Sequence, residues 1–388
     1  MTDGVRGRST RRKTITAVFC SIVGSLAGCL EGSDDNDGAA SFDAPEEVLR
    51  DEQFSLAIEG VPAEETIEII VETTDEFEQS WRARTVVDTG SGEGSESEDE
   101  TGDEHGNEER TLTLDLDDAD PIDGDVPAEL EVPTTMALLQ FLSPDNDVQG
   151  YQPMERTELR FGALVDDTLI GSTRVDWVLS DPDVEETRLE TDDLIGWLYE
   201  PTGDEPTPAA MTLHGSDGEP NTGTAAQLAS NGFTALALEY FAEADPLPRV
   251  LADVPLSYFE RAIEWLLERD RVEDDRVGLI GVSKGGECAL LAGSHIDEVG
   301  AVVSINGSGV VWPGFHEGSS SWMVDGDPVP YVPAVEHDAW GSRTLEPAYA
   351  ASFEAADEET LEEATIPVEE IRAPVCLVSG GKDNVWPS

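Results

Sequence analysis

Basic side chains are scarce in this sequence: 388 residues contain 22 Lys and Arg against 84 Asp and Glu, a formal net charge of −62 at pH 7. A surface this negative repels phosphate backbones, which excludes nucleic acid as a partner. The chain is nevertheless 39% hydrophobic and contains eight tryptophans, enough for a sizeable core. Because the acid excess runs through the segments that look folded, we expect a protein adapted to molar salt, where charge repulsion is screened within about 3 Å.

A long apolar run is also missing near the N-terminus. Residues 15–27 carry no charge and follow Arg11, Arg12 and Lys13, but a membrane-spanning helix needs about 20 apolar residues. This pattern predicts a signal peptide of the twin-arginine type over residues 1–28. Leu26-Ala27-Gly28-Cys29 resembles a lipobox, whose cysteine thiol receives lipid after cleavage. We therefore expect export and attachment to the outer face of the cell membrane through Cys29; the alternative is a plain signal peptide with an incidental cysteine.

Cysteine is rare, with four in the whole chain. With Cys29 lipidated, Cys288 and Cys376 are the only possible pair in the mature protein. Both lie in apolar strings, so we expect two buried free thiols and no disulfide.

The first half of the mature chain has the pattern of a β-rich domain. Residues 29–50 are rich in Asp, Gly and Ser and predict an acidic linker. Between residues 51 and 189, short alternating apolar runs are separated by Gly, Pro and Asp, which favours an antiparallel β-sandwich of roughly seven strands. Residues 89–110 are acidic with Gly and Ser, and we expect a disordered loop between two strands. Cation binding is the alternative role for that loop.

Residues 190–388 alternate between strand and helix patterns, which favours an α/β domain with helices on both faces of a parallel sheet. The expected helices are 222–230 and one that begins after Pro255. The expected strands are 209–213, 233–238, 277–282, 301–305 and 375–378.

The second half carries a candidate nucleophile, Ser283. The motif Gly281-Val282-Ser283-Lys284-Gly285 follows a predicted strand and opens a predicted helix, which is the setting of a nucleophile elbow. The glycines would let strand and helix approach closely while the serine hydroxyl points out of the sheet. The backbone N–H of Lys284 would face a developing oxyanion. The alternative is a structural turn.

Two further motifs follow predicted strands of the same domain. His214-Gly215-Ser216-Asp217-Gly218 matches the loop that supplies the second oxyanion donor in α/β-hydrolases, and we place that donor at or next to Ser216. His214 is interpreted as shaping this loop rather than as a base. Asp383 follows the last predicted strand, where an acid would hold a base imidazole in its working tautomer; the alternative is a helix cap.

These residues resemble the acyl-CoA thioesterase / bile acid-CoA:amino acid N-acyltransferase family, which has the α/β-hydrolase fold. Residues 255–266, 281–286, 328–333 and 374–388 carry the resemblance, and the β-rich half is more weakly similar to the family's N-terminal sandwich. The resemblance implies a Ser/Cys–His–Asp triad and acyl transfer from a thioester. In the family, cysteine at the nucleophile position goes with transfer to amino acids and serine with hydrolysis.

The sequence departs from the family in two respects. No histidine follows Asp383, although the family's base lies some tens of residues beyond the acid. We expect the sequence to be truncated at its C-terminus; the alternatives are a remnant without a base, or His316 or His337 as a substitute. The second departure is location, because an exported lipoprotein would rarely meet coenzyme A, so an extracellular ester or thioester is an equally good substrate.

We therefore predict an acyl-transfer hydrolase that acts on a small-molecule acyl ester or thioester and needs no metal and no bound cofactor. Ser283 and Asp383 are its expected catalytic residues. Two alternatives stay open: a lipid-anchored binding protein without catalysis, and an acyl-CoA:amino acid N-acyltransferase. The acyl chain, the acceptor and the oligomeric state are not predicted.

Overall fold

The computed structural model describes residues 40–386, except 64, 90–110, 129, 131, 145–153, 192, 243–246, 343 and 382. The predicted leader, Cys29 and nearly all of the acidic loop 89–110 therefore lie outside the described residues. Within the described part, no helix is long and apolar enough to cross a membrane. The chain divides into two compact units, Met1–Leu179 and Ser180–Ser388.

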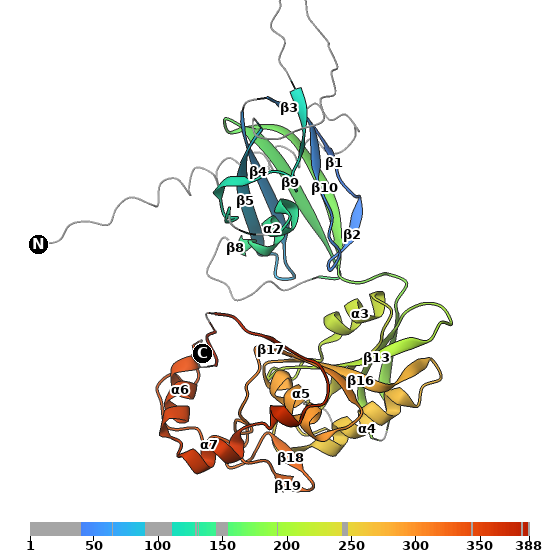
Figure 1. The fold of residues 1–388 in the computed structure, drawn as a ribbon, viewed down its shortest axis with the longest axis vertical. Helices are drawn as coiled ribbons and strands as arrows, with labels where there is room; N and C mark the ends of the chain where they lie inside the picture. The colour runs from blue at the N-terminus through green and yellow to red at the C-terminus, as the bar shows by residue number, and fades with distance from the viewer. Residues whose placement is uncertain are drawn as a thin grey trace, which may run out of the picture. The chain divides into compact units, whose positions relative to one another are not determined.

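The first unit is a sandwich of two sheets (Figure 1). One sheet has the order β1-β3-β6; the other has the order β2-β10-β9-β4-β5-β7, with β8 paired to β5. Both sheets contribute to one core, which contains Ile58 and Leu114 of the first sheet and Ile69 and Phe161 of the second. The elements are β1 Ser41–Asp43, β2 Glu47–Leu49, β3 Ala57–Pro62, β4 Thr66–Thr74, β5 Ser80–Asp88, β6 Thr111–Asp115, β7 Pro121–Gly124, α2 Thr134–Gln140, β8 Ser143–Pro144, β9 Arg156–Val165 and β10 Thr168–Val178.

The structure of the first unit differs from the sequence prediction in two respects. After residue 51 the structure describes eight strands in this unit, β3 to β10, close to the roughly seven expected. Strands β1 and β2 lie within the predicted linker 29–50, and β2 pairs in parallel with β10 rather than antiparallel. Each of these two strands is three residues long, too short for alternation to be visible in the sequence.

The second unit contains a seven-stranded sheet with the order β11-β12-β14-β13-β16-β17-β20. Strands from β14 to β20 run parallel, whereas β12 is antiparallel to both of its neighbours. This is the α/β-hydrolase arrangement. Its elements are β11 Glu185–Glu190, β12 Ile195–Glu200, β13 Thr207–Leu213, α3 Thr222–Ser230, β14 Thr234–Glu239, β15 Val254–Pro255, α4 Leu256–Leu267, β16 Val272–Val282, α5 Lys284–His295, β17 Val299–Ile305, β18 Trp322–Val324, β19 Asp327–Pro328, α6 Glu346–Ala355, α7 Glu358–Ala364, η1 Val368–Glu370 and β20 Val375–Val378.

The boundary expected at residues 189 and 190 is too late. Strand β11 belongs to the second unit, because Glu185–Glu190 pairs with β12 along its whole length. Its side chains are mostly exposed, so the sequence carries no apolar pattern that would assign it to the hydrolase sheet.

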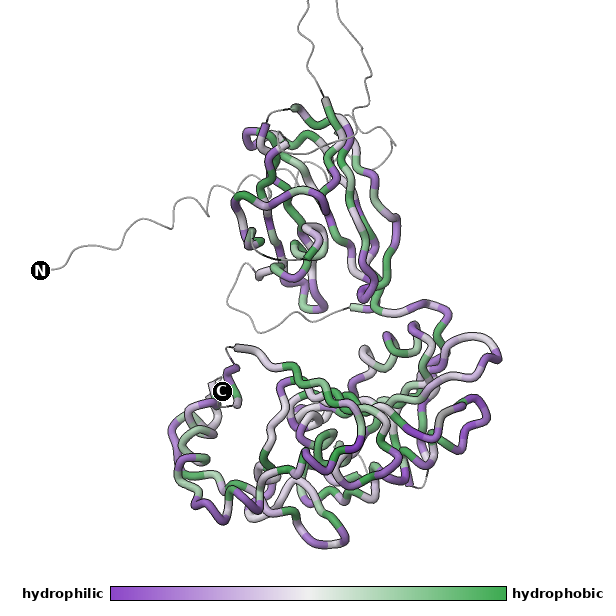
Figure 2. Tube along the Cα trace, in the orientation of Figure 1, coloured by the Kyte–Doolittle hydropathy of each residue, from purple (hydrophilic) through white to green (hydrophobic). Residues whose placement is uncertain are grey.

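Helices cover both faces of this sheet, as expected. Small residues of α3, including Ala225 and Ala229, pack against Ala235 and Ala237 of β14. The alternate residues of β14 point to the opposite face, where α4 and α5 form the larger core. Figure 2 shows hydrophobic residues along the sheet and hydrophilic ones in its outer turns.

Among the described residues, strand β20 is the last strand of this sheet, and its side chains are exposed. Cys376 lies in it and is exposed, which corrects the expectation of a buried thiol. No described element covers either face of β20, so the side chains of its apolar string are exposed. Cys288 of α5 is buried, and both thiols are free.

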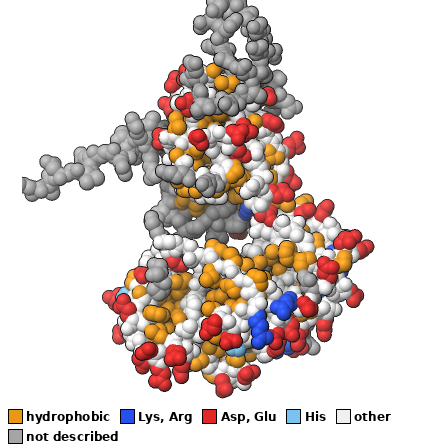
Figure 3. Space-filling view, in the orientation of Figure 1, with side chains coloured by type: hydrophobic (Ala, Val, Ile, Leu, Met, Phe, Trp, Pro, Cys, Tyr) orange, Lys and Arg blue, Asp and Glu red, His pale blue; other side chains and the backbone are white. Residues whose placement is uncertain are grey.

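Acidic side chains are spread over the visible surface of both units (Figure 3). The chain contains 62 more acids than Lys and Arg (84 − 22), so its own cations are too few to neutralise its carboxylates.

Candidate active site

Ser283 occupies a sharp turn between β16 and α5. Its φ of +53° and ψ of −117° fall outside the regions that non-glycine residues favour. The surrounding hydrogen bonds hold this conformation: Ser283 N donates to Ile305 O at 2.9 Å, and the Ser283 carbonyl accepts from the N–H groups of Gly286 and Glu287. Strain of this kind persists only where the surroundings enforce it and is concentrated at functional sites.

The motif glycines permit the close approach that this turn requires. A Cβ at Gly281 would lie 2.0 Å from the Gly285 carbonyl oxygen, and one at Gly285 would lie 2.3 Å from the Leu213 carbonyl oxygen. Residue 213 ends β13 and residue 281 lies near the end of β16. The turn is therefore packed directly against the strand that leads into the His214 loop.

The His214–Gly218 loop lies beside the nucleophile candidate. A Cβ at Gly215 would lie 3.5 Å from Ser283 Cβ, an ordinary van der Waals contact, so the loop lies directly against the nucleophile candidate. Ser216, the predicted position of the second oxyanion donor, follows and is exposed. The structure thus brings Ser283, the Lys284 amide at the start of α5 and the Ser216 loop to the same edge of the sheet.

His214 is buried and held in this loop by its ring. Nδ1 lies 2.9 Å from the Gly215 carbonyl oxygen, so Nδ1 carries the proton and donates it. The ring stacks on Tyr240 with centroids 3.9 Å apart, and the Tyr240 hydroxyl donates to the His214 carbonyl. Burial lowers the pKa of His214, although the bond to Gly215 opposes the shift. The ring is therefore neutral near pH 7 and suited to shaping the loop.

Asp383 follows β20 at the same carboxyl edge. Its Oδ1 accepts from the N–H groups of Val385 at 2.7 Å and Trp386 at 3.2 Å. Asn306, directly after β17, binds this loop through Gly380 N and Trp386 Nε1. Asp383 therefore caps a local turn. The loop that carries it is bound to Asn306, which follows Ile305, the residue whose carbonyl accepts from Ser283 N.

Among the described residues, no histidine ring is hydrogen-bonded to Ser283 or Asp383. His337 Nδ1 accepts from Ala339 N, and His295 Nδ1 bonds within α5. His316 is exposed, and His105 lies outside the described residues.

The sequence interpretation missed a buried ion pair next to the nucleophile. Lys284 Nζ donates to both carboxylate oxygens of Glu287, at 2.8 and 3.0 Å. Burial lowers the pKa of Lys284 and raises the pKa of Glu287, and each partner's charge opposes the other's shift. The sequence did contain a signal for this pair, because Lys284 and Glu287 are three residues apart on a predicted helix and such side chains are neighbours.

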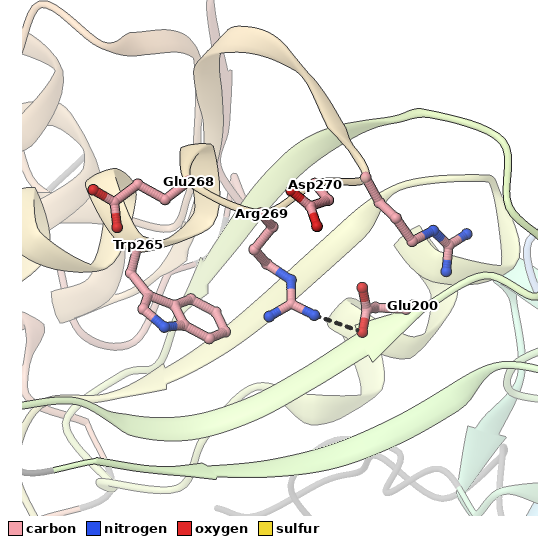
Figure 4. Close-up of a pocket in the computed structure, with 6 residues that line it drawn as sticks. Glu200, Trp265, Glu268, Arg269 and Asp270 are labelled. Atoms are coloured by element: carbon pink, nitrogen blue, oxygen red, sulfur yellow. Dashed lines mark hydrogen bonds and ion pairs between the residues drawn. The ribbon is translucent and has the colours of Figure 1, made fainter.

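A pocket on this unit lies away from these residues (Figure 4). Its lining includes Glu200 at the end of the antiparallel β12, and Arg271, whose carbonyl accepts from the first residue of β13. It therefore lies at the amino ends of the parallel strands, whereas ligands of open α/β sheets bind at the carboxyl ends. Within the described ranges, no group of three or more His, Cys, Asp or Glu is placed to hold a metal ion.

Comparisons with known proteins agree with the motifs. Residues 254–388 match the family described as "BAAT / Acyl-CoA thioester hydrolase C terminal". The chain is 38% identical over 131 residues to acyl-coenzyme A amino acid N-acyltransferase 2 of Rattus norvegicus, covering 34% of this chain and 31% of that protein. It is 27% identical over 197 residues to peroxisomal succinyl-coenzyme A thioesterase of Mus musculus, covering 49% and 44%. The chain thus spans less than half of the length of these curated relatives.

A solved structure is also similar in part. An esterase of Pyrococcus furiosus aligns with a TM-score of 0.34 at 17% identity, covering 53% of this chain and 72% of that one.

Proposed function

We propose that this protein is a serine hydrolase of acyl thioesters or esters, with Ser283 as the nucleophile. The observation that carries the proposal is the strained turn at Ser283, with φ +53° between a strand and a helix, packed against the His214–Gly218 loop. The similarity of residues 254–388 to acyl-CoA thioester hydrolases supports a thioester as the substrate class.

The proposed reaction proceeds through an acyl-enzyme. Ser283 Oγ attacks the substrate carbonyl carbon while a histidine imidazole takes its proton. The backbone N–H of Lys284 and one at or next to Ser216 stabilise the oxyanion. Collapse breaks the carbon–sulfur or carbon–oxygen bond, and the leaving group takes the proton from the imidazolium. Water, deprotonated by the same imidazole, then attacks the acyl-enzyme. The acyl–Oγ bond breaks, Ser283 Oγ takes the proton back from the imidazolium, and the acid is released.

Asp383 is proposed to orient that imidazole. Its loop lies on the same edge of the sheet as Ser283, and both are bound to consecutive residues of one segment, Ile305 and Asn306. A carboxylate in this position keeps the imidazole in the tautomer that accepts the serine proton.

The test uses protein expressed from its complete gene and assayed in molar KCl. Thiol release from acyl-CoA, and phenol release from p-nitrophenyl esters with the same acyl chains, measure the two substrate classes. We expect turnover of at least one class, and its loss in Ser283→Ala with binding retained. Binding without turnover in the unchanged protein would instead support a non-catalytic binding protein.

The acceptor is tested in the same assay. Water is the proposed acceptor, so adding glycine or taurine should leave free fatty acid as the product by mass spectrometry. An N-acyl amino acid as the main product would assign the transferase activity instead.

We also propose that lipid on Cys29 anchors the exported protein to the membrane. The support is the lipobox-like sequence Leu26–Cys29 after an uncharged run. Cys29→Ser should move the protein from the membrane fraction to the medium without changing its circular dichroism. Retention of the variant in the membrane fraction would contradict the anchor.

A further inference from the structure

Burying the Lys284–Glu287 ion pair removes two charges from water, and a gain in stability alone does not explain why the pair is there. The side chains of Lys284 and Glu287 are 2% and 0% exposed, and the chain has only three lysines in 388 residues. Replacing such a pair by apolar residues is often neutral or stabilising, because removing two charges from water offsets their attraction. Its place next to Ser283 therefore calls for another explanation.

The outer partners of the pair come from a distant segment of the chain. Lys284 Nζ also donates to the Trp312 carbonyl at 3.1 Å, and Ser321 Oγ donates to the same oxygen at 2.9 Å. Trp322 Nε1 donates to Glu287 Oε1 at 2.7 Å. Both indoles are fully buried. The pair thus joins the first turn of α5 to residues 308–324, which follow β17.

The same segment contacts the loop of Asp383. The Trp312 ring stacks on the Trp386 ring, with centroids 6.0 Å apart and an interplanar angle of 18°. The Trp386 N–H is capped by Asp383, and its indole donates to the Asn306 carbonyl. A continuous set of contacts therefore runs from the residue after Ser283 to the acid loop.

Lys284 links this network to the proposed chemistry. Its backbone N–H is the proposed oxyanion donor, and its side chain is fixed by three hydrogen bonds with fixed directions. Ser283, which precedes it, needs its unusual φ to be enforced by its neighbours. Apolar side chains would fill the same space without setting a direction for the peptide between residues 283 and 284.

We propose that the Lys284–Glu287 ion pair is a positioning unit, which aligns the Ser283 hydroxyl and the Lys284 amide by tying the start of α5 to Trp312 and Trp322. This proposal rests on the serine hydrolase function proposed above. Neither side chain touches the substrate, so both act through the elbow they hold.

The variant Lys284→Met/Glu287→Gln removes both charges but leaves Trp322 Nε1 an amide oxygen to bind. We expect kcat to fall about 10²-fold, because a displacement of about 1 Å at reacting groups has that effect, while KM stays within about twofold. The matched control is Arg269→Met/Glu200→Leu, which removes the 3.0 Å pair drawn in Figure 4, at the amino ends of the strands. This control variant should have the kcat of the unchanged protein, even if its melting temperature changes.

The outcomes separate this inference from the function on which it rests. Inactive unchanged protein would contradict the hydrolase itself. Active unchanged protein with an unchanged kcat in the double variant would overturn only the positioning unit and leave the pair structural. If circular dichroism shows that the double variant does not fold, Trp322→Phe decides, since it removes one bond to Glu287 and keeps the ring. It should lower kcat about tenfold, and an unchanged kcat there would overturn the inference.

Discussion

Adding one methyl group at Gly281 tests whether the tight turn at Ser283 is what the site depends on. In Gly281→Ala the new Cβ would lie 2.0 Å from Gly285 O, 2.3 Å from Gly285 C and 2.6 Å from Gly286 N. Ordinary contact begins near 3.4 Å, so the carbonyl has to retreat by about 1.4 Å (3.4 − 2.0). All three atoms are backbone, so no side-chain rotation relieves the clash, and the start of α5 must move.

The size of the effect follows from this displacement. Overpacking of this kind costs about 1–3 kcal/mol. For a unit of this size, that lowers the melting temperature by about 2–12 °C. Moving the reacting hydroxyl and the oxyanion donor by about 1 Å should lower kcat about 10²-fold.

The control is Gly278→Ala in the same strand. Its Cβ would meet only Ala209 O, at 3.8 Å, so stability should be unchanged or rise by up to about 1 kcal/mol, as alanine is favoured over glycine within a strand. Thermal unfolding and thiol release from acyl-CoA, both in molar KCl, measure the two variants. Equal turnover and equal melting temperature in both would refute the argument that the Ser283 turn is set by this packing.

Three other predictions follow from charge and geometry. The melting temperature should fall as KCl is lowered from molar to about 0.1 M, where the excess acids repel each other over about 10 Å; an unchanged circular dichroism signal throughout would contradict adaptation to salt. Asp383→Asn keeps an oxygen to cap Val385 and Trp386 but should lower kcat about 10⁴-fold. The control Asp357→Asn, which alters the cap of α7 at Thr360, should keep kcat. If Asp383→Asn is as active as the unchanged protein, Asp383 is only a cap. Burial lowers the folded-state pKa of His214, so as the pH falls below about 6.5 the unfolded form binds a proton more readily than the folded form. The stability advantage of the unchanged protein over His214→Gln should therefore shrink between pH 7.5 and 5.5. A constant difference would show that His214 does not contribute to the pH dependence.

The parallel strands and two helices of the second unit could be predicted closely from the sequence. Helix α3 begins and ends where the apolar pattern placed it, and strand β14 lies within one residue of its expected bounds, because buried elements must be apolar on their inner faces. Strand β11 could not be predicted, since its exposed side chains leave only backbone pairing to define it.

The site was predictable only in part. Ser283, the Ser216 loop and Asp383 follow strands whose carboxyl ends meet at one edge, so topology brings them together. The bonds of Glu287 to Trp322 and of Lys284 to Trp312 join residues 28 to 35 positions apart, and no local pattern encodes such pairs. Likewise, the capping of Val385 and Trp386 by Asp383 depends on the path of a loop.

Covalent labelling shows directly whether Ser283 is the nucleophile. Protein from the complete gene is treated with a fluorophosphonate in molar KCl, digested and mapped by mass spectrometry. If Ser283 is the nucleophile, a single adduct forms on the peptide that contains Ser283 and is absent in Ser283→Ala. Thioester turnover by Ser283→Ala at the rate of the unchanged protein, or an adduct on another residue that abolishes activity, would contradict it.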